Sequence, residues 1–387
     1  MKCVQERASV EIRCNYPGGN VKVTSLKAGE AKIESDLRDT PTHWFYWNFE
    51  VEALTPGSIT FTFPKGKEFL SAQGPCISRD GGKSWQWLGT EDCFFLNEDP
   101  ANLSDGFVLT FGHAGETFRV AQGFPYQLAD FQKFADSIRH RAQISVLTTS
   151  NGGRPCPMIV TGTGKKKMLL TARHHACEAA ASFVWEGFVA EALENMDFQK
   201  EYTLFAIPFM DLDGVEQGDQ GKGRTPHDHN RDYALDHPIY AETAAVQALH
   251  AEQKFYIALD LHDPAVRSDD CLYPGAAIKD AHEHFYFAGY QSPSNAANTK
   301  TFIGEINKEF PAECRTPLIF GGKTPMKRDG IHGLPFSYYF GDDEHVLYGT
   351  TLEIPYANCY PEYDSSMMKA AGGALLRALL HTEFVRL

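Results

Sequence analysis

Polar and hydrophobic residues alternate along the first third of the chain. Ile59, Phe61 and Phe63 alternate with serine and threonine residues, and a second alternation runs through residues 45–51. A period of two is typical of strands that are buried on one face only. Short strands of this kind, separated by glycine-rich turns, predict an N-terminal antiparallel β-sandwich domain over residues 1–125. Its aromatic side chains are expected in the core, and a sugar-binding face is the alternative.

Beyond residue 126 the pattern changes, and apolar strands alternate with segments of helical periodicity. Helical periodicity is found at residues 130–138, 178–195 and 239–253, and strand-like apolar runs at residues 155–161, 167–172, 202–209, 255–261 and 345–354. This alternation predicts a doubly wound, mostly parallel α/β domain over residues 126–387, with helices on both faces of the sheet. No low-complexity linker separates the two predicted domains, so we expect them to pack directly against each other.

The composition of the 387 residues is that of a soluble globular protein, with 43% hydrophobic and 22% charged residues. A net charge of −14 argues against nucleic acid or an anionic membrane as the main partner, because both require a basic face. No apolar stretch has the length of a membrane span, and the charged N-terminus lacks the apolar segment of a signal peptide. The nine cysteines are scattered and never spaced as Cys-x-x-Cys, which fits reduced thiols. These features predict a cytoplasmic protein and do not indicate its oligomeric state.

A His-x-x-Glu motif occurs at His175 and Glu178, directly after the predicted strand at residues 167–172. Side chains three residues apart at the start of a helix project to one side and can bind one Zn²⁺. His262 follows the apolar run at residues 255–261, where a strand would bring it to the edge of a sheet as a third ligand. Two imidazole nitrogens and one carboxylate leave a fourth position for water, which hydrolytic zinc requires.

The same motif occurs a second time, at His113 and Glu116. With fifteen histidines, roughly one such motif is expected by chance in a chain of this size. The second copy lies between two strand-like runs, at residues 107–111 and 118–120, and neighbouring glycines favour a reversal of the chain. We therefore interpret it as the turn of a β-hairpin and not as a metal site.

The predicted strand at residues 202–209 leads into a long polar loop that ends at Arg231. Loops of this length are uncommon in a compact domain unless they have a function. The loop carries Lys222, Arg224 and Arg231, an island of positive charge in an acidic protein. Arginines at this place could polarise a scissile carbonyl and bind a carboxylate through two hydrogen bonds. A solvated charged loop is the alternative.

Glu353 interrupts a strand-like run that is otherwise almost entirely apolar or small. A central strand seldom contains a carboxylate unless the carboxylate is paired or takes part in catalysis. Next to a metal site Glu353 would be a general base. A solvent-facing glutamate on an edge strand is the alternative. His227, His229 and Asp260 are weaker candidates for a function in this site.

Taken together, these motifs resemble the zinc carboxypeptidase family. The segments that carry the resemblance occur in the family's order: His175-x-x-Glu178, Asp228-x-Asn230-Arg231, Asp260-Leu-His262 and Thr351-Leu-Glu353. In the first domain, the segments at residues 44–47, 78–85 and 124–126 are similar to the N-terminal β-sandwich of the cytosolic carboxypeptidase subfamily. The resemblance covers nearly the whole chain, and it implies a β-sandwich followed by a carboxypeptidase catalytic domain.

The resemblance implies one Zn²⁺ per chain, bound by His175, Glu178 and His262. It also implies that Glu353 is the general base and proton shuttle. Arg224 is the closest match to the arginine that stabilises the oxyanion in this family, although its spacing departs from the family's pattern. The family's active-site tyrosine has no clear match between His262 and Glu353, and we leave it unassigned.

Further residues match the substrate-binding positions of the family. Asn230 and Arg231 match the pair that binds the terminal carboxylate, and Asp228 matches the carboxylate that orients the first zinc histidine. The subfamily implies a preference for acidic C-terminal residues, Glu or Asp, which an acidic protein can bind only through a focused basic pocket. Arg328 is a candidate for binding the side-chain carboxylate, and a solvated basic turn is the alternative.

The sequence therefore predicts a cytoplasmic zinc metallocarboxypeptidase that hydrolyses a C-terminal peptide or isopeptide bond. Its expected partner is the C-terminus of a peptide or protein. An aspartoacylase-type zinc amidohydrolase is one alternative, and the β-sandwich ahead of the catalytic domain argues against it. A non-catalytic carboxypeptidase fold that only binds is another. Such a protein is expected to have lost a metal ligand or the glutamate, and the sequence retains both.

Overall fold

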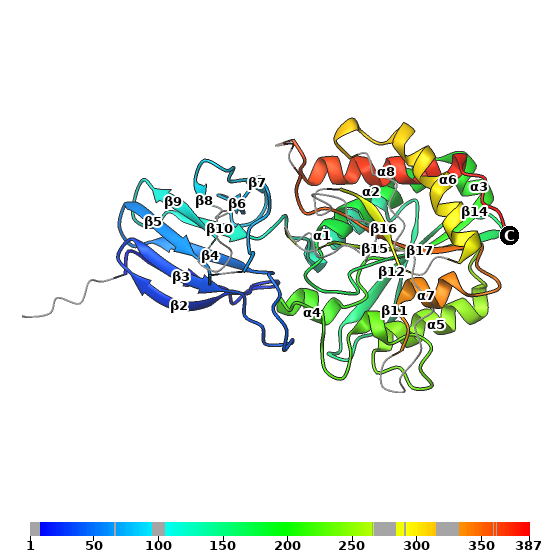
Figure 1. Ribbon diagram of the computed structural model, residues 1–387, viewed down its shortest axis with the longest axis horizontal. Coiled ribbons are helices and arrows are strands. Elements are labelled where there is room, and N and C mark those ends of the chain that lie inside the picture. Colours follow the sequence, from blue (N-terminus) through cyan, green and yellow to red (C-terminus); the bar gives the residue numbers. More distant parts are fainter. Residues whose placement is uncertain are drawn as a thin grey trace, which may run out of the picture.

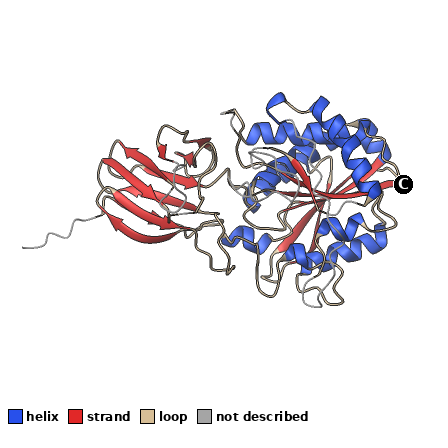
Figure 2. Cartoon of the chain, viewed as in Figure 1, coloured by secondary structure: helices blue, strands red, loops and turns tan. Residues whose placement is uncertain are grey.

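The computed structural model describes residues 8–65, 67–94, 105–264, 266, 284–289, 292–314, 333–358, 360 and 362–387. An all-strand part at one end of the molecule precedes a larger part in which helices surround a central sheet (Figures 1 and 2). Among the described residues, no helix has both the length and the apolar character needed to cross a lipid bilayer.

The described strands of the first part form two five-stranded sheets. One sheet has the order β1 (Val10–Arg13), β4 (Asn48–Ala53), β10 (Thr117–Ala121), β6 (Cys76–Ser78) and β7 (Gln86–Trp87). The other has the order β2 (Lys22–Lys27), β3 (Glu30–Glu34), β5 (Gly57–Thr62), β9 (Gly106–Phe111) and β8 (Cys93–Phe94). The pairing of β3 with β5 is parallel. The prediction of antiparallel strands is therefore wrong for this pair and right for the other described pairs of both sheets.

Aromatic residues from both sheets form the core of this part. Trp47, Phe49, Phe61 and Phe107 are each fully buried. The ring of Phe107 stacks on that of Phe61 at 4.9 Å and on that of Trp47 at 5.8 Å between centroids. Alternate positions of a strand face the same side of its sheet, which is why the period-two pattern placed these rings together. They are core residues, as predicted, and they line no sugar-binding face.

The second His-x-x-Glu motif lies in the connection between β9 and β10. These strands belong to different sheets, so the predicted hairpin is wrong and the connection crosses from one sheet to the other. The backbone N–H of Gly112 donates a hydrogen bond to Glu116 Oε2 at 2.6 Å. His113 is exposed. The motif stabilises a turn, and His113 and Glu116 belong to neither of the candidate metal-binding groups among the described residues.

The described strands after residue 142 form one seven-stranded sheet. Its order is β11 (Gln143–Thr149), β12 (Pro155–Thr161), β14 (Tyr202–Ile207), β13 (Lys166–Ala172), β15 (Ile257–His262), β17 (Tyr348–Glu353) and β16 (Tyr286–Ala288). The four central strands β14, β13, β15 and β17 are parallel. The strands β11, β12 and β16 pair antiparallel. The sheet is therefore mixed, and the prediction of a mostly parallel sheet holds only for its centre.

Helices cover both faces of this sheet. They are α1 (Leu128–Ile138), α2 (Ala180–Glu194), α3 (Met196–Glu201), α4 (Leu212–Gln217), α5 (Ala241–Gln253), α6 (Pro293–Glu309), α7 (Phe336–Gly341) and α8 (Ser365–His381), with short 3₁₀ turns at His229–Arg231 and Ala312–Cys314. Figure 1 shows α2, α6 and α8 on one face, and α5 and α7 on the other.

The helices α2 and α8 pack against each other, and their contact requires glycine at two positions. A Cβ atom on Gly187 of α2 would lie 1.9 Å from the carbonyl oxygen of Lys369 in α8. A Cβ atom on Gly372 of α8 would lie 2.1 Å from the carbonyl oxygen of Val184 in α2. The two helix backbones are therefore in direct contact, and a larger residue at either position would force them apart.

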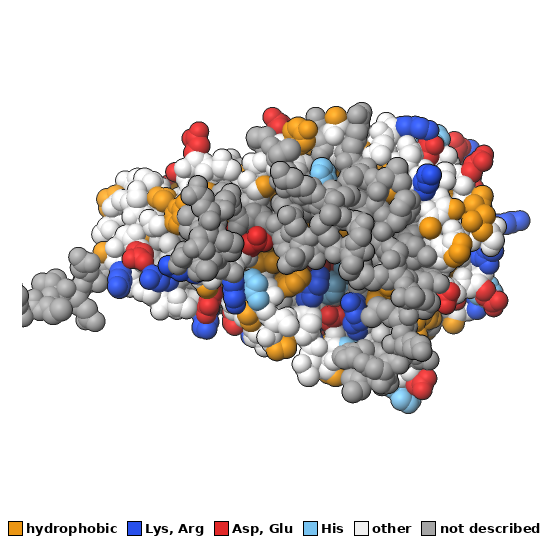
Figure 3. All heavy atoms as spheres, viewed as in Figure 1, with side chains coloured by type: hydrophobic (Ala, Val, Ile, Leu, Met, Phe, Trp, Pro, Cys, Tyr) orange, Lys and Arg blue, Asp and Glu red, His pale blue; other side chains and the backbone are white. Residues whose placement is uncertain are grey.

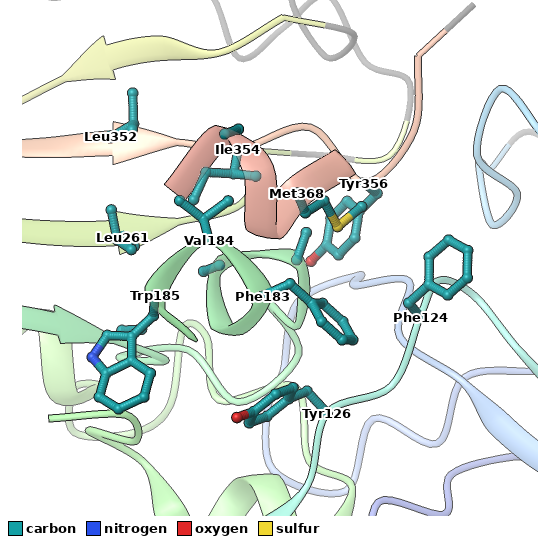
Figure 4. Packing of buried hydrophobic residues seen from close by; sticks show 14 of the residues in the cluster. Phe124, Tyr126, Phe183, Val184, Trp185, Leu261, Leu352, Ile354, Tyr356 and Met368 are labelled. Carbon is teal, nitrogen blue, oxygen red and sulfur yellow. The ribbon is translucent and has the colours of Figure 1, made fainter. Parts of the chain in front are cut away.

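Aromatic rings join the two parts of the chain directly. The ring of Phe124 meets that of Trp87 in the first part edge to face, with 4.7 Å between the ring centroids. It also meets the ring of Phe183 in α2, with 6.4 Å between the centroids (Figure 4). Tyr126 contacts the other side of Phe183 at 5.2 Å. The prediction that the two parts pack against each other is confirmed by these contacts, while a boundary between domains at residue 125 stays a prediction.

Candidate metal centre

Three neighbouring parallel strands end at the same edge of the sheet and bring the predicted site residues together. His262 ends β15 and Glu353 ends β17, and the two residues are direct partners in the strand pairing. His175 and Glu178 lie in the turn between β13 and α2, which begins at Ala180. Polar side chains at the carboxyl ends of parallel strands form the usual binding site of an α/β sheet.

The side chains of His175, Glu178 and His262 converge on one point. Glu178 Oε1 lies 2.7 Å from His175 Nδ1, and Glu178 Oε2 lies 2.7 Å from His262 Nδ1. The two Nδ1 atoms are 3.1 Å apart, and all three side chains are buried. Ligand atoms of a tetrahedral zinc ion are separated by roughly 3.3 Å, so small movements of these side chains would accommodate the ion. The donor set and its geometry therefore fit a zinc ion.

Burial and charge set different proton affinities for the two histidines. Burial lowers the pKa of His175 to about 4, so its imidazole is neutral and offers a lone pair. Burial acts in the same direction on His262, but the carboxylates of Asp260 and Glu178 outweigh it and raise the pKa of His262 well above its usual value. Binding of a metal at His262 Nδ1 is thus expected to displace a proton.

The carboxylate of Glu353 lies at the same edge and is partly exposed. Removal from water and repulsion by Glu178 raise the pKa of Glu353 to about 7, although His262 and Lys222 act in the opposite direction. A carboxyl group with this pKa can both accept and release a proton near neutral pH.

Among the described residues, Lys222 is the lysine or arginine that contacts the converging side chains. The sequence pattern identified it only as one of three basic residues in the polar loop and gave it no role in the site. Its ammonium group lies 3.1 Å from Glu178 Oε1 and 4.4 Å from the centre of the Trp44 ring. Burial by itself would lower the pKa of Lys222, but Glu178 and Glu353 outweigh burial and raise it, so the side chain is charged. Lysine, arginine and histidine side chains gather near the middle of the face in Figure 3.

The first part of the chain holds the loop that carries Lys222. Both carboxylate oxygens of Asp39 accept backbone hydrogen bonds, from Gln220 N–H at 3.0 Å and from Gly221 N–H at 2.8 Å. Gly221 has a φ of +74°, and a Cβ atom there would lie 2.2 Å from the backbone nitrogen of Ala176. Glycine is therefore required for the loop to pass this close to the metal-binding turn. No local sequence pattern predicts this contact, because Asp39 and Gly221 are far apart in the chain.

Arg224 has a different environment from the one predicted. Its guanidinium binds three carboxylates: Asp39 at 3.0 Å, Asp211 at 2.7 Å and Asp219 at 3.0 Å. Each of its three nitrogens contacts one of them, which favours a structural function over the predicted stabilisation of the oxyanion. The arginine joins the first part of the chain to the loop after β14.

Replacement of Arg224 by methionine is expected to destabilise the fold by about 3–5 kcal/mol, since three largely buried carboxylates would lose their common partner. Chemical denaturation measures this change. The matched control is Arg139→Met, because Arg139, the C-cap of α1, forms an exposed pair with Asp136, and such pairs contribute at most about 1 kcal/mol. Equal, small effects of both substitutions would show that the carboxylate cluster does not depend on Arg224.

Asp228 and Asn230 flank the two histidines. Asp228 Oδ2 accepts a hydrogen bond from the backbone of Gly223 at 2.9 Å, and its Oδ1 lies 3.9 Å from His175 Nε2. Asn230 Nδ2 lies 3.5 Å from His262 Nε2, and Asn230 Oδ1 accepts a hydrogen bond from the backbone of Phe336 at 2.9 Å. The structure thus brings Asp228 close to the first histidine, where it was predicted, but beyond direct hydrogen-bond distance.

Arg231 is half-buried beside these residues, and its guanidinium donates to the carbonyl oxygen of Asn230 at 2.7 Å. Among the described residues, this is the one hydrogen bond or ion pair of the Arg231 guanidinium. Arg328 lies outside the described residues, as does much of the stretch in which the active-site tyrosine was sought. Of the weaker candidates, His227 binds Asp232 at 2.7 Å and His229 stacks on a tyrosine ring. Neither histidine belongs to a candidate metal-binding group of the described residues.

Comparison with known proteins gives relatives of one kind. No family model matches the chain. Cytosolic carboxypeptidase 1 of Mus musculus is 22% identical over 338 residues, which cover 72% of this chain and 27% of the mouse protein. Cytosolic carboxypeptidase 2 of Danio rerio is 23% identical over 321 residues, which cover 72% of this chain and 44% of the fish protein. The chain thus spans between about a quarter and a half of the length of these curated relatives.

Solved structures resemble the chain over almost its entire length. The metallo-carboxypeptidase of Pseudomonas aeruginosa, in complex with (2-guanidinoethylmercapto)succinic acid, has a TM-score of 0.76 at 18% identity and covers 95% of this chain and 98% of its own. The metallo-carboxypeptidase of Burkholderia cenocepacia has a TM-score of 0.73 at 18% identity, with coverage of 96% and 98%. These similarities establish a shared fold. The chain is therefore similar in sequence to cytosolic carboxypeptidases and in fold to metallo-carboxypeptidases, the kinds of protein that its motifs resemble.

Proposed function

We propose that the protein is a zinc-dependent metallocarboxypeptidase whose metal ligands are His175, Glu178 and His262. The observation that carries the proposal is the convergence of these three side chains, within 3.1 Å of one another, at the strand end that also carries Glu353. A bound zinc ion would lower the pKa of a water molecule and polarise the scissile carbonyl. Side chains of this protein carry out the proton transfers, stabilise the oxyanion and bind the substrate.

Glu353 is the proposed general base. Its carboxylate accepts a proton from the attacking water and then delivers it to the nitrogen of the departing amine. A pKa of about 7 supports both transfers near neutral pH. The partial exposure of Glu353 at the end of β17 leaves room for the substrate to reach it.

Lys222 is the proposed cation that stabilises the negative charge on the carbonyl oxygen in the transition state. It replaces Arg224 in this role, because Arg224 is bound by three carboxylates while Lys222 faces Glu178 directly. A fixed cation in a site shielded from water stabilises a developing oxyanion strongly. The ring of Trp44 beneath the ammonium group holds it in place, so the N-terminal domain of residues 1–125 contributes to the site in the catalytic domain of residues 126–387.

Asn230 and Arg231 are the proposed binding site for the free carboxylate at the end of the substrate. Arg231 has donors available for two parallel hydrogen bonds to a carboxylate, and this recognition restricts cleavage to the last residue of a chain. Asp228 is proposed to orient His175 through its Nε2 atom once the site is loaded. We further propose a cytoplasmic location and a preference for acidic C-terminal residues, because the chain is similar in sequence to cytosolic carboxypeptidases.

The test is release of the last amino acid from peptides that differ only at that residue. Peptides that end in Glu, Lys, Phe or Ala are compared by kcat/KM, and each is also tested with an amidated C-terminus. We expect cleavage of free termini, with Glu preferred, and a loss of at least about 100-fold on amidation, because the amide cannot pair with Arg231.

Three outcomes would contradict parts of this proposal. Equal rates for free and amidated termini would exclude carboxylate recognition. A preference for Phe or Lys would exclude the acidic specificity alone. Rapid deacylation of N-acetylaspartate or N-acetylglutamate, without cleavage of any peptide, would indicate an amidohydrolase of the aspartoacylase type.

A further inference from the structure

The second ring nitrogen of His262 begins a buried chain of hydrogen bonds that leads away from the proposed metal. His262 Nε2 lies 2.5 Å from Asp260 Oδ2, and Asp260 Oδ1 lies 2.8 Å from His174 Nδ1. His174 Nε2 lies 2.8 Å from the hydroxyl oxygen of Tyr233. His174, Tyr233 and Asp260 are fully buried, and His262 is 2% exposed. Side chains at alternate positions of a strand share one face, which is why Asp260 and His262 of β15 meet.

The carboxylate of Asp260 fixes the direction of the two hydrogen bonds that it forms with the imidazoles. An ionised carboxylate only accepts, so His262 must carry a proton on Nε2 and His174 must carry one on Nδ1. When His174 is neutral, its Nε2 accepts a hydrogen bond from the hydroxyl of Tyr233. Asp260 Oδ1 also accepts a hydrogen bond from the hydroxyl of Thr171 at 2.8 Å. Each of these donors therefore faces an acceptor.

We propose that Asp260, His174 and Tyr233 are positioning residues that hold the proton of His262 on Nε2 and leave Nδ1 free to bind the metal, an inference that rests on the proposed metal site. Carboxylates that accept the distal proton of a metal-binding imidazole fix its tautomer and orientation and strengthen it as a ligand. Here the carboxylate is itself fixed by a second imidazole and a hydroxyl. Tyr233 is packed against Phe336 of α7, so the far end of the chain is anchored in the core.

His174, Asp260 and His262 also lie close enough together to be considered as a second metal-binding group. The hydrogen bonds favour the positioning role. Tyr233 already satisfies His174 Nε2, and Asp260 already accepts from both imidazoles. A second metal would have to displace two of these protons in a site without access to water. One zinc per chain is therefore expected, and a second zinc that is lost in His174→Leu would overturn the inference.

Nitrogen-15 NMR of the zinc-loaded wild-type protein, labelled at histidine, reads the proton positions directly. The expected result is a proton on Nε2 of His262 and on Nδ1 of His174, both in strong hydrogen bonds. A proton on the opposite nitrogen of either ring would overturn the inference. This measurement needs no substitution, so it does not depend on whether a variant folds.

Zinc affinity, measured by competition with a chelator, tests the function of these buried hydrogen bonds. Asp260→Asn is expected to weaken zinc binding by about 10- to 100-fold, with Tyr233→Phe at the lower end of this range. Tyr348→Phe is the matched control, because it removes the hydroxyl of another fully buried tyrosine, which lies 2.9 Å from the hydroxyl of Thr299, and it should bind zinc like the wild type. Wild-type affinity in folded Asp260→Asn, or an equal loss in Tyr348→Phe and Tyr233→Phe, would overturn the inference. A zinc-loaded wild type without peptidase activity would instead overturn the proposed reaction and leave this inference standing.

Discussion

Replacement of His175 or His262 by alanine is expected to reduce zinc affinity by more than about 100-fold, the upper end of the range for residues that only support a metal ligand. Each substitution removes one ligand from three buried side chains whose nearest nitrogen and oxygen atoms are 2.7–3.1 Å apart. Elemental analysis of the purified protein and competition with a chelator measure the effect. Wild-type protein is expected to hold about one zinc per chain.

The chain contains its own control for this experiment. His113→Ala alters the other His-x-x-Glu motif, whose histidine is exposed in the connection between β9 and β10, and it should leave zinc binding unchanged. Full zinc content in His175→Ala together with its loss in His113→Ala would show that the metal site has been assigned to the wrong motif. Thermal unfolding distinguishes loss of the ligand from loss of the fold.

The strands around this site could be predicted because they are buried on both faces. Such strands are continuous apolar runs, and the runs predicted at residues 167–172 and 255–261 correspond to β13 (Lys166–Ala172) and β15 (Ile257–His262). The long helix predicted at residues 178–195 is α2, from Ala180 to Glu194. The three converging side chains followed from these elements, because each lies at or just after the end of a strand in the parallel centre of the sheet.

Strand direction and strand partnership could not be predicted in the same way. A periodic pattern states which residues are buried, but the direction of a strand depends on the connection that precedes it. The strands β9 and β10 follow each other with a tight turn and still join different sheets. Within the predicted polar loop, Asp211 accepts from the backbone of Gly214 and starts the helix α4, which is too short to produce a detectable period.

Local sequence patterns did not predict which basic residue of the polar loop lies next to the metal ligands. Lys222 and Arg224 are two residues apart in the same loop and equally basic, and the sequence favoured Arg224. The structure separates them, since Asp39 binds the guanidinium of Arg224 and Trp44 supports the ammonium group of Lys222. Both contacts come from the first part of the chain. Contacts between distant segments determine which of two similar cations faces a site, and a single sequence does not encode them in any local pattern.

Glu353→Gln is expected to retain the fold and the zinc ion and to lose about 10²- to 10⁴-fold in kcat, the range for removal of a general base. Glutamine fills the same volume at the end of β17 but cannot accept a proton from water. The two proposed metal-binding imidazoles and Glu178 are unchanged, so zinc content should be that of the wild type. Single-turnover kinetics, combined with elemental analysis, separate the loss of the base from a loss of metal.

The pH profile provides a second test of the same residue. A base must be unprotonated, so kcat/KM of the wild type should fall as the pH drops through the pKa of Glu353. That pKa is about 7 in the protein without metal, and a nearby cation lowers the pKa of a carboxylate, so the acid limb is expected below pH 7. The residual activity of Glu353→Gln should lack this limb, whereas Glu344→Gln, which alters an exposed carboxylate ahead of the same strand, should keep it. Wild-type kcat in Glu353→Gln, or an unchanged acid limb in its residual activity, would show that another group accepts the proton.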